Sequence, residues 1–332
     1  PPFEAAIIDE AQHLEEAITH SLTFVLDAQQ LKYRLTDVSG KSRGLLNDLL
    51  RAVRTGAPEA VAQQFEVYGE IIREAARAMQ VQIGALFEAL ESLMTELRAQ
   101  RQEATSHRVT AELRKQTAFE HAGAVWRGLA EYFDAMCTAM RRLHSGLLRL
   151  GEYPIPDYLD LTQATAASAR FFSETQTQLD GFFNPSDSGR IYWLHQAHEE
   201  RGVSINSAPL HIGALVDQHL WSARRSVILT GATLRGGDTF DLLRERLGAG
   251  DIETLAIPSP YNFKSAALLY LPTDLPEPND RSRYQAAVER ALIELATALD
   301  GRLLALFTSY TQLRQTAQAI TPRLALGNIA VL

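Results

Sequence analysis

The spacing of apolar residues divides the chain into a helical middle section and two flanking sections of mixed strands and helices. In the middle section, from about residue 42 to 182, apolar residues recur every three or four positions over 72–97 and again over 126–150. This spacing places them on one seam of a helix. We therefore expect two long helices, joined by the polar stretch around residues 100–118, that pack as an antiparallel hairpin.

Short apolar runs in the flanking sections predict strands. The first is 5–8, and the others are 191–194, 226–229, 254–257, 267–271 and 303–307. A helix is expected from Arg281 to Leu299, framed by prolines and a glycine. Strands that alternate with helices are typical of a parallel, doubly wound sheet. The predicted fold is α/β, with a large all-α segment inserted into a parallel sheet.

Composition limits the class of protein. The chain has 332 residues, of which 46% are hydrophobic, so two or more structural units are expected. The absence of a long apolar run and of a signal-peptide pattern predicts a cytoplasmic protein without a membrane partner. Cys137 is the only cysteine, so the chain by itself can hold neither a disulfide framework nor a four-cysteine zinc or iron–sulfur site.

The net charge of −8 does not favour nucleic-acid binding, because proteins that follow a phosphate backbone are usually basic. Basic residues that gather in one groove can offset this, and the candidates are Arg141, Arg142, Arg149, Arg224 and Arg225. For the first three, a solvated helix face is the preferred interpretation.

Two adjacent acids, Asp9 and Glu10, directly follow the apolar run 5–8. A carboxylate pair at the end of a buried strand suits a nucleotide-hydrolysing site, in which one acid holds Mg²⁺ through its water and the other orients or deprotonates the attacking water. In these roles Asp9 is the magnesium residue and Glu10 activates water. The alternative is structural, since acids in the first turn of a helix complement the helix dipole.

A second candidate is the turn Thr230-Gly231-Ala232-Thr233, which follows the apolar run 226–229. Threonine hydroxyls both donate and accept hydrogen bonds, so they suit a relay between a nucleotide site and a second surface. Taken alone, these residues favour the alternative of an ordinary turn in which threonine caps the next helix.

A third candidate, Thr308-Ser309-Tyr310, follows the apolar run 303–307. Hydroxyls before a helix can bind phosphate oxygens, and a tyrosine can stack on a base. In the structural alternative, Ser309 is only a helix N-cap and Tyr310 packs on the sheet.

Two short patterns are set aside. Gly40-Lys41-Ser42 is similar to the end of a phosphate-binding loop, but Leu35 stands where that pattern requires glycine. The histidines form no convincing metal set, and a surface pair is the preferred interpretation of His195 and His198.

Taken together and in this order, the three strings resemble superfamily 2 helicases of the XPD/DinG branch. Residues 8–14 read like the DEAH box, and residues 230–234 are similar to the T-S-A-T-L motif that follows the helical arch. Further landmarks lie at 191–194, 207–210, 257–263 and 271–276, so the resemblance covers nearly the whole chain. It implies partial RecA-like motor domains with an inserted arch: 1–28 ends the first motor domain, 29–186 is the arch, 187–265 returns to the first domain and 266–332 begins the second.

The resemblance also implies roles for residues. Asp9 and Glu10 would act on Mg·ATP, and Gln12 with the 230–233 turn would couple hydrolysis to DNA movement. The 308–310 string would lie near the nucleic-acid track. Family members move 5′ to 3′ along single-stranded DNA, and many carry a 4Fe–4S cluster whose cysteines precede the DEAH box.

Two positions depart from the family pattern. Gln12 stands where the family usually has histidine, which removes a titratable group but keeps a donor and an acceptor. Gly231 replaces the usual serine and so deletes one hydroxyl from the same relay. Both departures concern coupling, whereas the metal and water roles of Asp9 and Glu10 are not touched.

Both ends of the chain are interpreted as cut, because the chain lacks an initiator methionine and its two ends are strand-like. The phosphate loop would precede Pro1 and the arginine-bearing motifs would follow Leu332, so this chain alone is not expected to hydrolyse ATP. The hypothesis is a monomeric parent protein that moves on single-stranded DNA in replication or repair. The alternatives are a non-catalytic DNA-binding or scaffold protein on a decayed helicase fold, and a fusion with an N-terminal nuclease.

Overall fold

The computed structural model describes residues 3–40, 44–100, 105–184, 189–196 and 202–332. They belong to two compact units, Pro1–Thr254 and Leu255–Leu332. Lys41, Ser42 and His198, which belong to the two patterns set aside above, lie outside the described residues. None of the described helices combines the length and the apolar character needed to cross a membrane.

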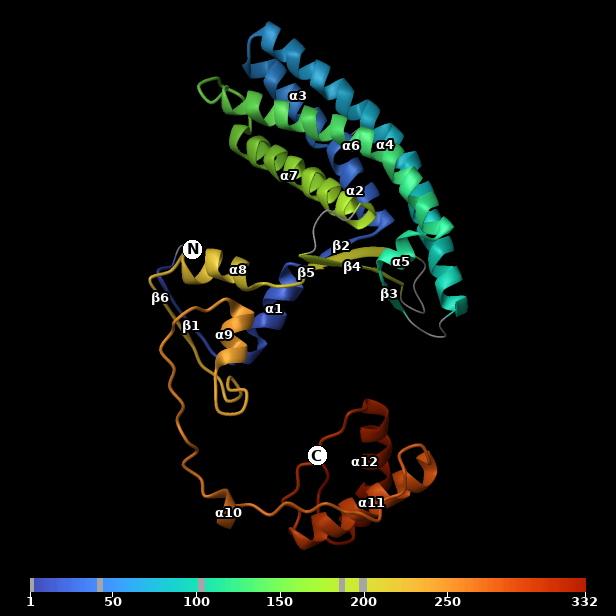
Figure 1. Cartoon of the computed structure of the whole chain (residues 1–332), viewed down its shortest axis with the longest axis vertical. Helices are drawn as coiled ribbons and strands as arrows, with labels where there is room; N and C mark the ends of the chain where they lie inside the picture. Colours follow the sequence, from blue (N-terminus) through green and yellow to red (C-terminus); the bar gives the residue numbers. More distant parts are fainter. Residues whose placement is uncertain (1–2, 41–43, 101–104, 185–188, 197–201) are drawn as a thin grey trace. The chain divides into compact units, whose positions relative to one another are not determined.

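The predicted antiparallel hairpin of long helices is confirmed. Helix α4 runs from Glu59 to Gln100 and α6 from Thr117 to Leu148, and the two lie side by side (Figure 1). Their apolar seams are buried, with Ile72, Met79 and Ile83 on α4 and Trp126 and Phe133 on α6 at most 1% exposed. Each such side chain contributes about 1.5–3 kcal/mol by burial, which explains why the seam spacing predicts the hairpin.

Three further helices complete this bundle: α2 (Ala28–Ser39), α3 (Leu45–Gly56) and α7 (Tyr158–Phe183). Asp27 begins α2, because its side chain accepts a hydrogen bond from the Gln30 main-chain N–H at 2.7 Å. The Trp126 indole Nε1 donates to Asp180 Oδ1 at 3.0 Å, which joins α6 to α7 inside an aromatic cluster.

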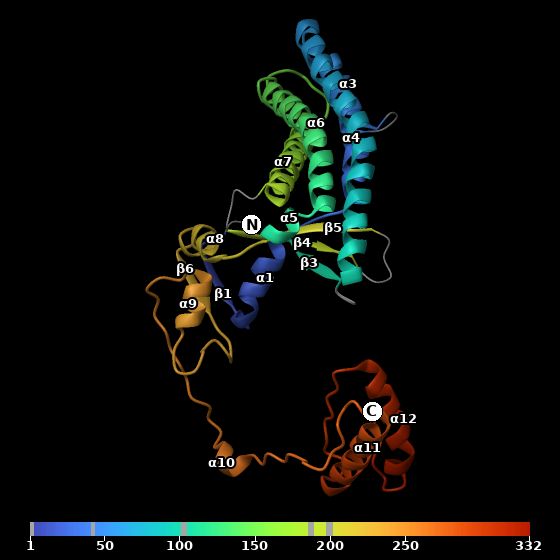
Figure 2. The ribbon, with the colours of Figure 1, turned by 45° about the vertical axis from the view of Figure 1, so that its right-hand side comes forward.

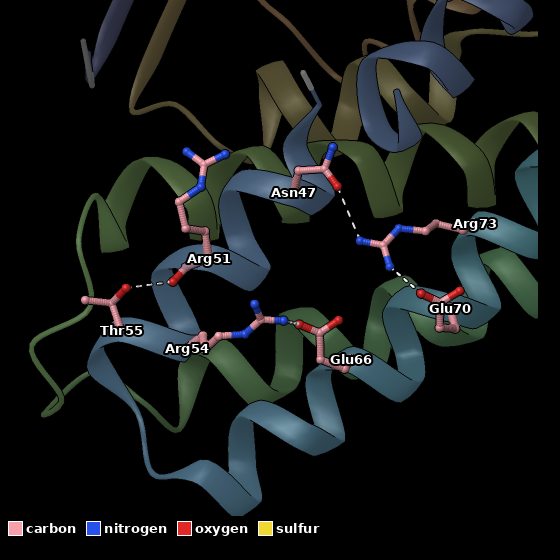
Figure 3. A network of polar contacts seen from close by, with 7 residues as sticks. All are labelled: Asn47, Arg51, Arg54, Thr55, Glu66, Glu70 and Arg73. Atoms are coloured by element: carbon pink, nitrogen blue, oxygen red, sulfur yellow. Dashed lines mark hydrogen bonds and ion pairs between the residues drawn. The ribbon is translucent and has the colours of Figure 1, made fainter. Parts of the chain in front are cut away.

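A polar network fixes α3 against α4 (Figure 3). Arg73 of α4 donates to Asn47 Oδ1 of α3 at 3.3 Å and forms an ion pair with Glu70 at 2.5 Å. Arg54 of α3 forms an ion pair with Glu66 of α4. The guanidinium of Arg73 thus bridges the two helices through one planar group.

A four-stranded antiparallel sheet lies at one end of the bundle, as both ribbon views show (Figures 1 and 2). Its strand order is β2 (Phe24–Leu26), β5 (Ser204–Pro209), β4 (Arg190–His195) and β3 (Ser106–Arg108). The strand predicted at 191–194 is confirmed within β4, but its expected place in a parallel sheet is wrong. The link 196–203 between β4 and β5 is too short for the crossover that parallel neighbours need. A four-residue helix, α5 (Ala111–Arg114), lies between β3 and α6.

The parallel part of the fold is a pair of strands. β1 (Ala5–Ile8) and β6 (Ser226–Leu229) lie in parallel register, with Ala5 opposite Ser226 and Ile8 opposite Leu229. The strands predicted at 5–8 and 226–229 are therefore confirmed. Short helices follow β1 and flank β6 in the chain: η1 (Ala11–His13), α1 (Leu14–Ser21), α8 (Gly213–Val216), η2 (Asp217–Trp221) and α9 (Asp241–Leu247).

The second unit contains α10 (Phe263–Ala266), α11 (Arg281–Ala298) and α12 (Tyr310–Ala325). The helix predicted at 281–299 is confirmed as α11. The strands predicted at 254–257, 267–271 and 303–307 are wrong, because no described residue pairs with these segments. Leu268 is 94% exposed and Leu306 is 86% exposed, so these apolar runs have neither a ladder partner nor a covering layer among the described residues. The four-part domain division stays a prediction.

Candidate functional site

The chain turns sharply where β1 ends. Asp9 is exposed and follows the strand directly, and Glu10 has a left-handed backbone, with φ 51° and ψ 39°. A residue other than glycine seldom adopts this conformation, and such residues cluster at functional sites. Glu10 begins the 3₁₀ turn η1, but its side chain forms no cap hydrogen bond. No acidic residue lies in the first turn of η1, where the structural alternative of dipole complementation places the acids.

Main-chain hydrogen bonds join this turn to the end of β6. Thr230 N donates to Ile8 O at 2.9 Å, and Ala11 N donates to Thr230 O at 3.0 Å. Because β1 and β6 are parallel neighbours, their carboxyl ends meet at one edge of the sheet. The structure thus brings the predicted Asp9-Glu10 pair and the predicted 230–233 turn together, although more than 200 residues separate them in the sequence.

Gln12 lies between the two strings. Its Nε2 donates to Glu10 Oε2 at 2.5 Å, and its Oε1 faces Gly231. The family resemblance alone pointed to Gln12, and its contact with Glu10 was not predicted. The spacing of two residues across a turn was the one signal that pointed to this contact.

Neither threonine of the 230–233 turn caps the next helix, which the structural alternative required. Thr230 and Thr233 are both exposed, and the next helix, α9, has Phe240 at its N-cap. The interpretation that threonine caps the next helix is therefore wrong. Thr230 holds β1 through its main-chain N–H and carbonyl, which leaves its hydroxyl at the sheet edge.

The third string, Thr308-Ser309-Tyr310, belongs to the second unit. Ser309 is the N-cap of α12, and its Oγ accepts from Gln312 N at 3.4 Å. Tyr310 is 84% exposed, so the alternative in which it packs on a sheet is wrong. An exposed tyrosine at a helix start is available for stacking.

The candidate arginines fall into two groups. Arg141, Arg142 and Arg149 are exposed on or just after α6, as a solvated helix face predicts. Arg224 is half-buried and lies over the Phe3 ring, with 4.2 Å from its Cζ to the ring centroid. Arg224 therefore packs beside β1, whereas Arg225 is exposed like the arginines of the first group.

A cleft of about 400 Å³ opens beside Gln12 and was missed by the sequence analysis. It lies along α1 and α9, and Arg246 of α9 forms an ion pair with Glu15 of α1 at 3.0 Å. The residues that line it are Gln12, Glu15, Glu16, Thr19, His20, Thr23 and Arg246.

The residues at the edge fit a magnesium–nucleotide complex. Mg²⁺ in such sites keeps several waters and uses only one or two carboxylates, because phosphate oxygens supply further ligands. Asp9 offers one exposed carboxylate at the sheet edge. Within the described ranges no group of three or more histidine, cysteine or acidic side chains could hold a metal ion by itself.

The fold and this edge define an α/β protein with a parallel strand pair and a large helical insertion between its strands, the class that the helicase resemblance implies. The chain is 24% identical over 350 residues to the 3′-5′ exonuclease DinG of Bacillus subtilis (strain 168), covering all of this chain and 36% of that protein. It is 30% identical over 160 residues to the ATP-dependent helicase DinG of Mycobacterium tuberculosis (strain ATCC 25618 / H37Rv), covering 46% of this chain and 24% of that protein.

A further relative is the ATP-dependent DNA helicase YoaA of Escherichia coli (strain K12), 29% identical over 164 residues, which cover 48% of this chain and 25% of that protein. These similarities confirm the predicted resemblance to DinG-type helicases. The chain spans about a third of the length of the B. subtilis relative and matches about a quarter of each of the other two. No family model matches the chain.

Proposed function

We propose that the whole protein is an ATP-dependent DNA helicase or translocase of the XPD/DinG type that acts on single-stranded DNA. The observation that carries the proposal is the Asp9-Glu10 turn at the end of β1, tied by main-chain hydrogen bonds to the 230–233 turn. The similarity to the ATP-dependent helicases of M. tuberculosis and E. coli supports it.

In this function Asp9 and Glu10 have different roles. Asp9 would hold the Mg²⁺ of Mg·ATP through its water, and the bound ion would supply neutralisation of the negative charge on the phosphates. Glu10 orients or deprotonates the attacking water. Its left-handed backbone turns the main chain sharply after β1, and the hydrogen bond from Gln12 holds its carboxylate. A fixed carboxylate lowers the cost of aligning water for attack.

Coupling passes from this edge to the 230–233 turn. A shift of the acidic turn moves Ala11 N and Ile8 O, and both are hydrogen-bonded to Thr230. Thr230, Gly231 and Thr233 therefore respond to the nucleotide, while Thr308, Ser309 and Tyr310 contact the DNA strand in the second motor domain. We assign the movement 5′-to-3′ polarity and a role in repair or replication, as the family resemblance implies.

The test is ATP hydrolysis by the full-length protein, with and without single-stranded DNA. We expect hydrolysis that DNA stimulates and that Glu10→Gln abolishes, because the amide cannot accept the proton of water. The matched control is Glu4→Gln, which makes the same change just before β1, at the other end of the strand, where the side chain is exposed.

Polarity is measured in parallel with duplexes that carry a single-stranded tail at either the 5′ or the 3′ end. Displacement only from the 5′ tail is the expected result. Failure of the wild type to hydrolyse ATP would transfer the assignment to the non-catalytic binding or scaffold alternative. Strand degradation without displacement would transfer it to the activity named for the B. subtilis relative.

A further inference from the structure

The two positions that depart from the family pattern face each other. A Cβ placed on Gly231 would lie 2.5 Å from Gln12 Oε1 and 3.3 Å from the Leu234 side chain. Carbon and oxygen atoms of separate groups do not approach to 2.5 Å, because they then overlap. Any residue larger than glycine at position 231 must therefore displace the Gln12 carboxamide. The space that Gln12 occupies therefore exists because residue 231 has no side chain.

The other end of the same carboxamide is held by Glu10. An ionised carboxylate only accepts hydrogen bonds, so the atom of Gln12 that faces Glu10 must be the amide nitrogen. This fixes the amide orientation and leaves Oε1 on the Gly231 side. Oε1 is buried there and meets no hydrogen-bond donor among the described residues. The contact with Glu10 is thus the single polar interaction that orients the carboxamide within the described structure.

We propose that Gln12 and Gly231 form a size-matched pair that positions Glu10 for hydrolysis. Gly231 supplies the space, Gln12 fills it, and the hydrogen bond from Gln12 Nε2 holds the Glu10 carboxylate in place. Gln12 is a positioning residue, because it acts on water only through Glu10. This inference rests on the proposed function and adds a specific role for Gly231, which becomes a steric requirement of the acidic site.

Gly231→Ala is the sharpest probe of this pair. The φ of Gly231 lies outside the left-handed range, so alanine fits the backbone. The nearest atom that it meets is the end of a flexible side chain, and the Leu234 side chain at 3.3 Å has to give by only a few tenths of an ångström. The fold is therefore retained, and Gln12 makes the main movement. We expect kcat for ATP hydrolysis by the full-length protein to fall by about tenfold to a hundredfold, because a displaced catalytic group costs that much. The KM for ATP should stay within about twofold, since no binding contact is removed.

The matched control is Gly236→Ala in the same loop. A Cβ there would meet only Leu242 side-chain atoms at 3.9 Å, which is ordinary contact. Its φ also lies outside the left-handed range. Both variants change glycine to alanine within one loop, so a loss of loop flexibility would affect both, whereas displacement of Gln12 affects only one.

A double-mutant cycle separates positioning from general damage. Gln12→Ala removes the carboxamide, so it lowers kcat but also removes the collision. Adding Gly231→Ala to the Gln12→Ala protein should then have no further effect on kcat. If Gly231→Ala lowers kcat by the same factor in both backgrounds, the pair is overturned, because the damage does not pass through Gln12.

A crystal structure of full-length Gly231→Ala keeps this test separate from the proposed function. Loss of hydrogen-bond distance between Gln12 Nε2 and Glu10 Oε2 supports the pair, and an unchanged contact overturns it. Wild-type protein that does not hydrolyse ATP would refute the proposed function, and with it the positioning role. Wild-type protein that is active while Gly231→Ala equals it in kcat would refute the pair alone.

Discussion

Gly128 and Gly146 of α6 both face α4, but the space that α4 leaves around them differs. At Gly128 an added Cβ would meet only Gln82 Oε1, at 3.5 Å, whereas at Gly146 it would lie 2.8 Å from Cζ and 2.9 Å from Cε2 of Phe65. Phe65 is 3% exposed, so its ring cannot swing into solvent. The same substitution in one helix therefore tests an open position and a filled one.

The magnitudes follow from two opposing terms. Glycine to alanine inside a helix stabilises by about 0.5–1 kcal/mol. Overpacking a filled core costs about 1–3 kcal/mol. Gly128→Ala should therefore stabilise by up to about 1 kcal/mol, while Gly146→Ala should destabilise by up to about 2 kcal/mol. Gly146 lies in the last turn of α6, so its helix-propensity gain is no larger than that of Gly128. A net loss of stability in Gly146→Ala therefore reports the contact with Phe65.

The assay is thermal unfolding of both variants, followed by circular dichroism. About 1 kcal/mol shifts the Tm of a unit of this size by about 2–4 °C, so the two variants should differ by roughly 2–12 °C. An equal rise in Tm for both variants would refute the reasoning, because it would mean that the Phe65 ring yields without cost. Gly146→Ala combined with Phe65→Leu is the control, since the shorter side chain makes room for the new Cβ.

Two further predictions concern charges in the helical bundle. Burial raises the pKa of Asp180, so the folded protein keeps this proton to a higher pH than the unfolded chain, and stability falls as pH rises through the interval between the two pKa values. Asp180→Asn keeps an acceptor for Trp126 and removes the charge, so Tm at neutral pH should rise and the loss of stability with rising pH should disappear. A Tm that is lowered equally at every pH would contradict this. Arg73→Ala should cost about 1–2 kcal/mol and Arg54→Ala less than about 1 kcal/mol, because the Arg73 side chain is 25% exposed and that of Arg54 is 71% exposed. Urea unfolding of the two variants measures this, and equal losses would count against it.

The elements that the sequence predicts well are those whose stability is local. The α4–α6 hairpin follows from apolar residues at helical spacing, and α11 follows from its flanking prolines and glycine. The runs 267–271 and 303–307 have strand-like composition, but a strand exists only where a neighbour supplies ladder hydrogen bonds. Composition cannot show whether that neighbour is present.

β5 is a strand that the sequence did not predict, the opposite error to the strands expected at 267–271 and 303–307. Its sequence, Ser-Ile-Asn-Ser-Ala-Pro, lacks an apolar run, yet five of its six residues are buried. Buried polar groups are stable only when they are hydrogen-bonded. Ser207 Oγ donates to Gln178 of α7 at 2.6 Å and accepts from Arg190 of β4 at 3.0 Å. These partners lie 17 to 29 residues earlier in the chain, so no local pattern indicates that this segment is interior.

The candidate site likewise contains a part that the sequence predicts and a part that it does not. Asp9 and Glu10 are predictable, because two acids at the end of an apolar run mark a strand's carboxyl end. The contact between Gln12 and Gly231 cannot be predicted from the sequence, because each residue taken alone is only a departure from a family pattern. Their meaning depends on the parallel register of β1 with β6, which brings position 231 within reach of position 12.

The antiparallel sheet explains how that register survives a large insertion. Closing a loop of about 200 residues between β1 and β6 carries an entropic cost that the short strand pair would meet alone. β2 follows soon after β1, β5 comes shortly before β6, and β2 pairs with β5 through Phe24 opposite Ser207 and Leu26 opposite Ile205. This pairing joins the entry of the insertion to its exit, so β1 and β6 have only short segments left to close.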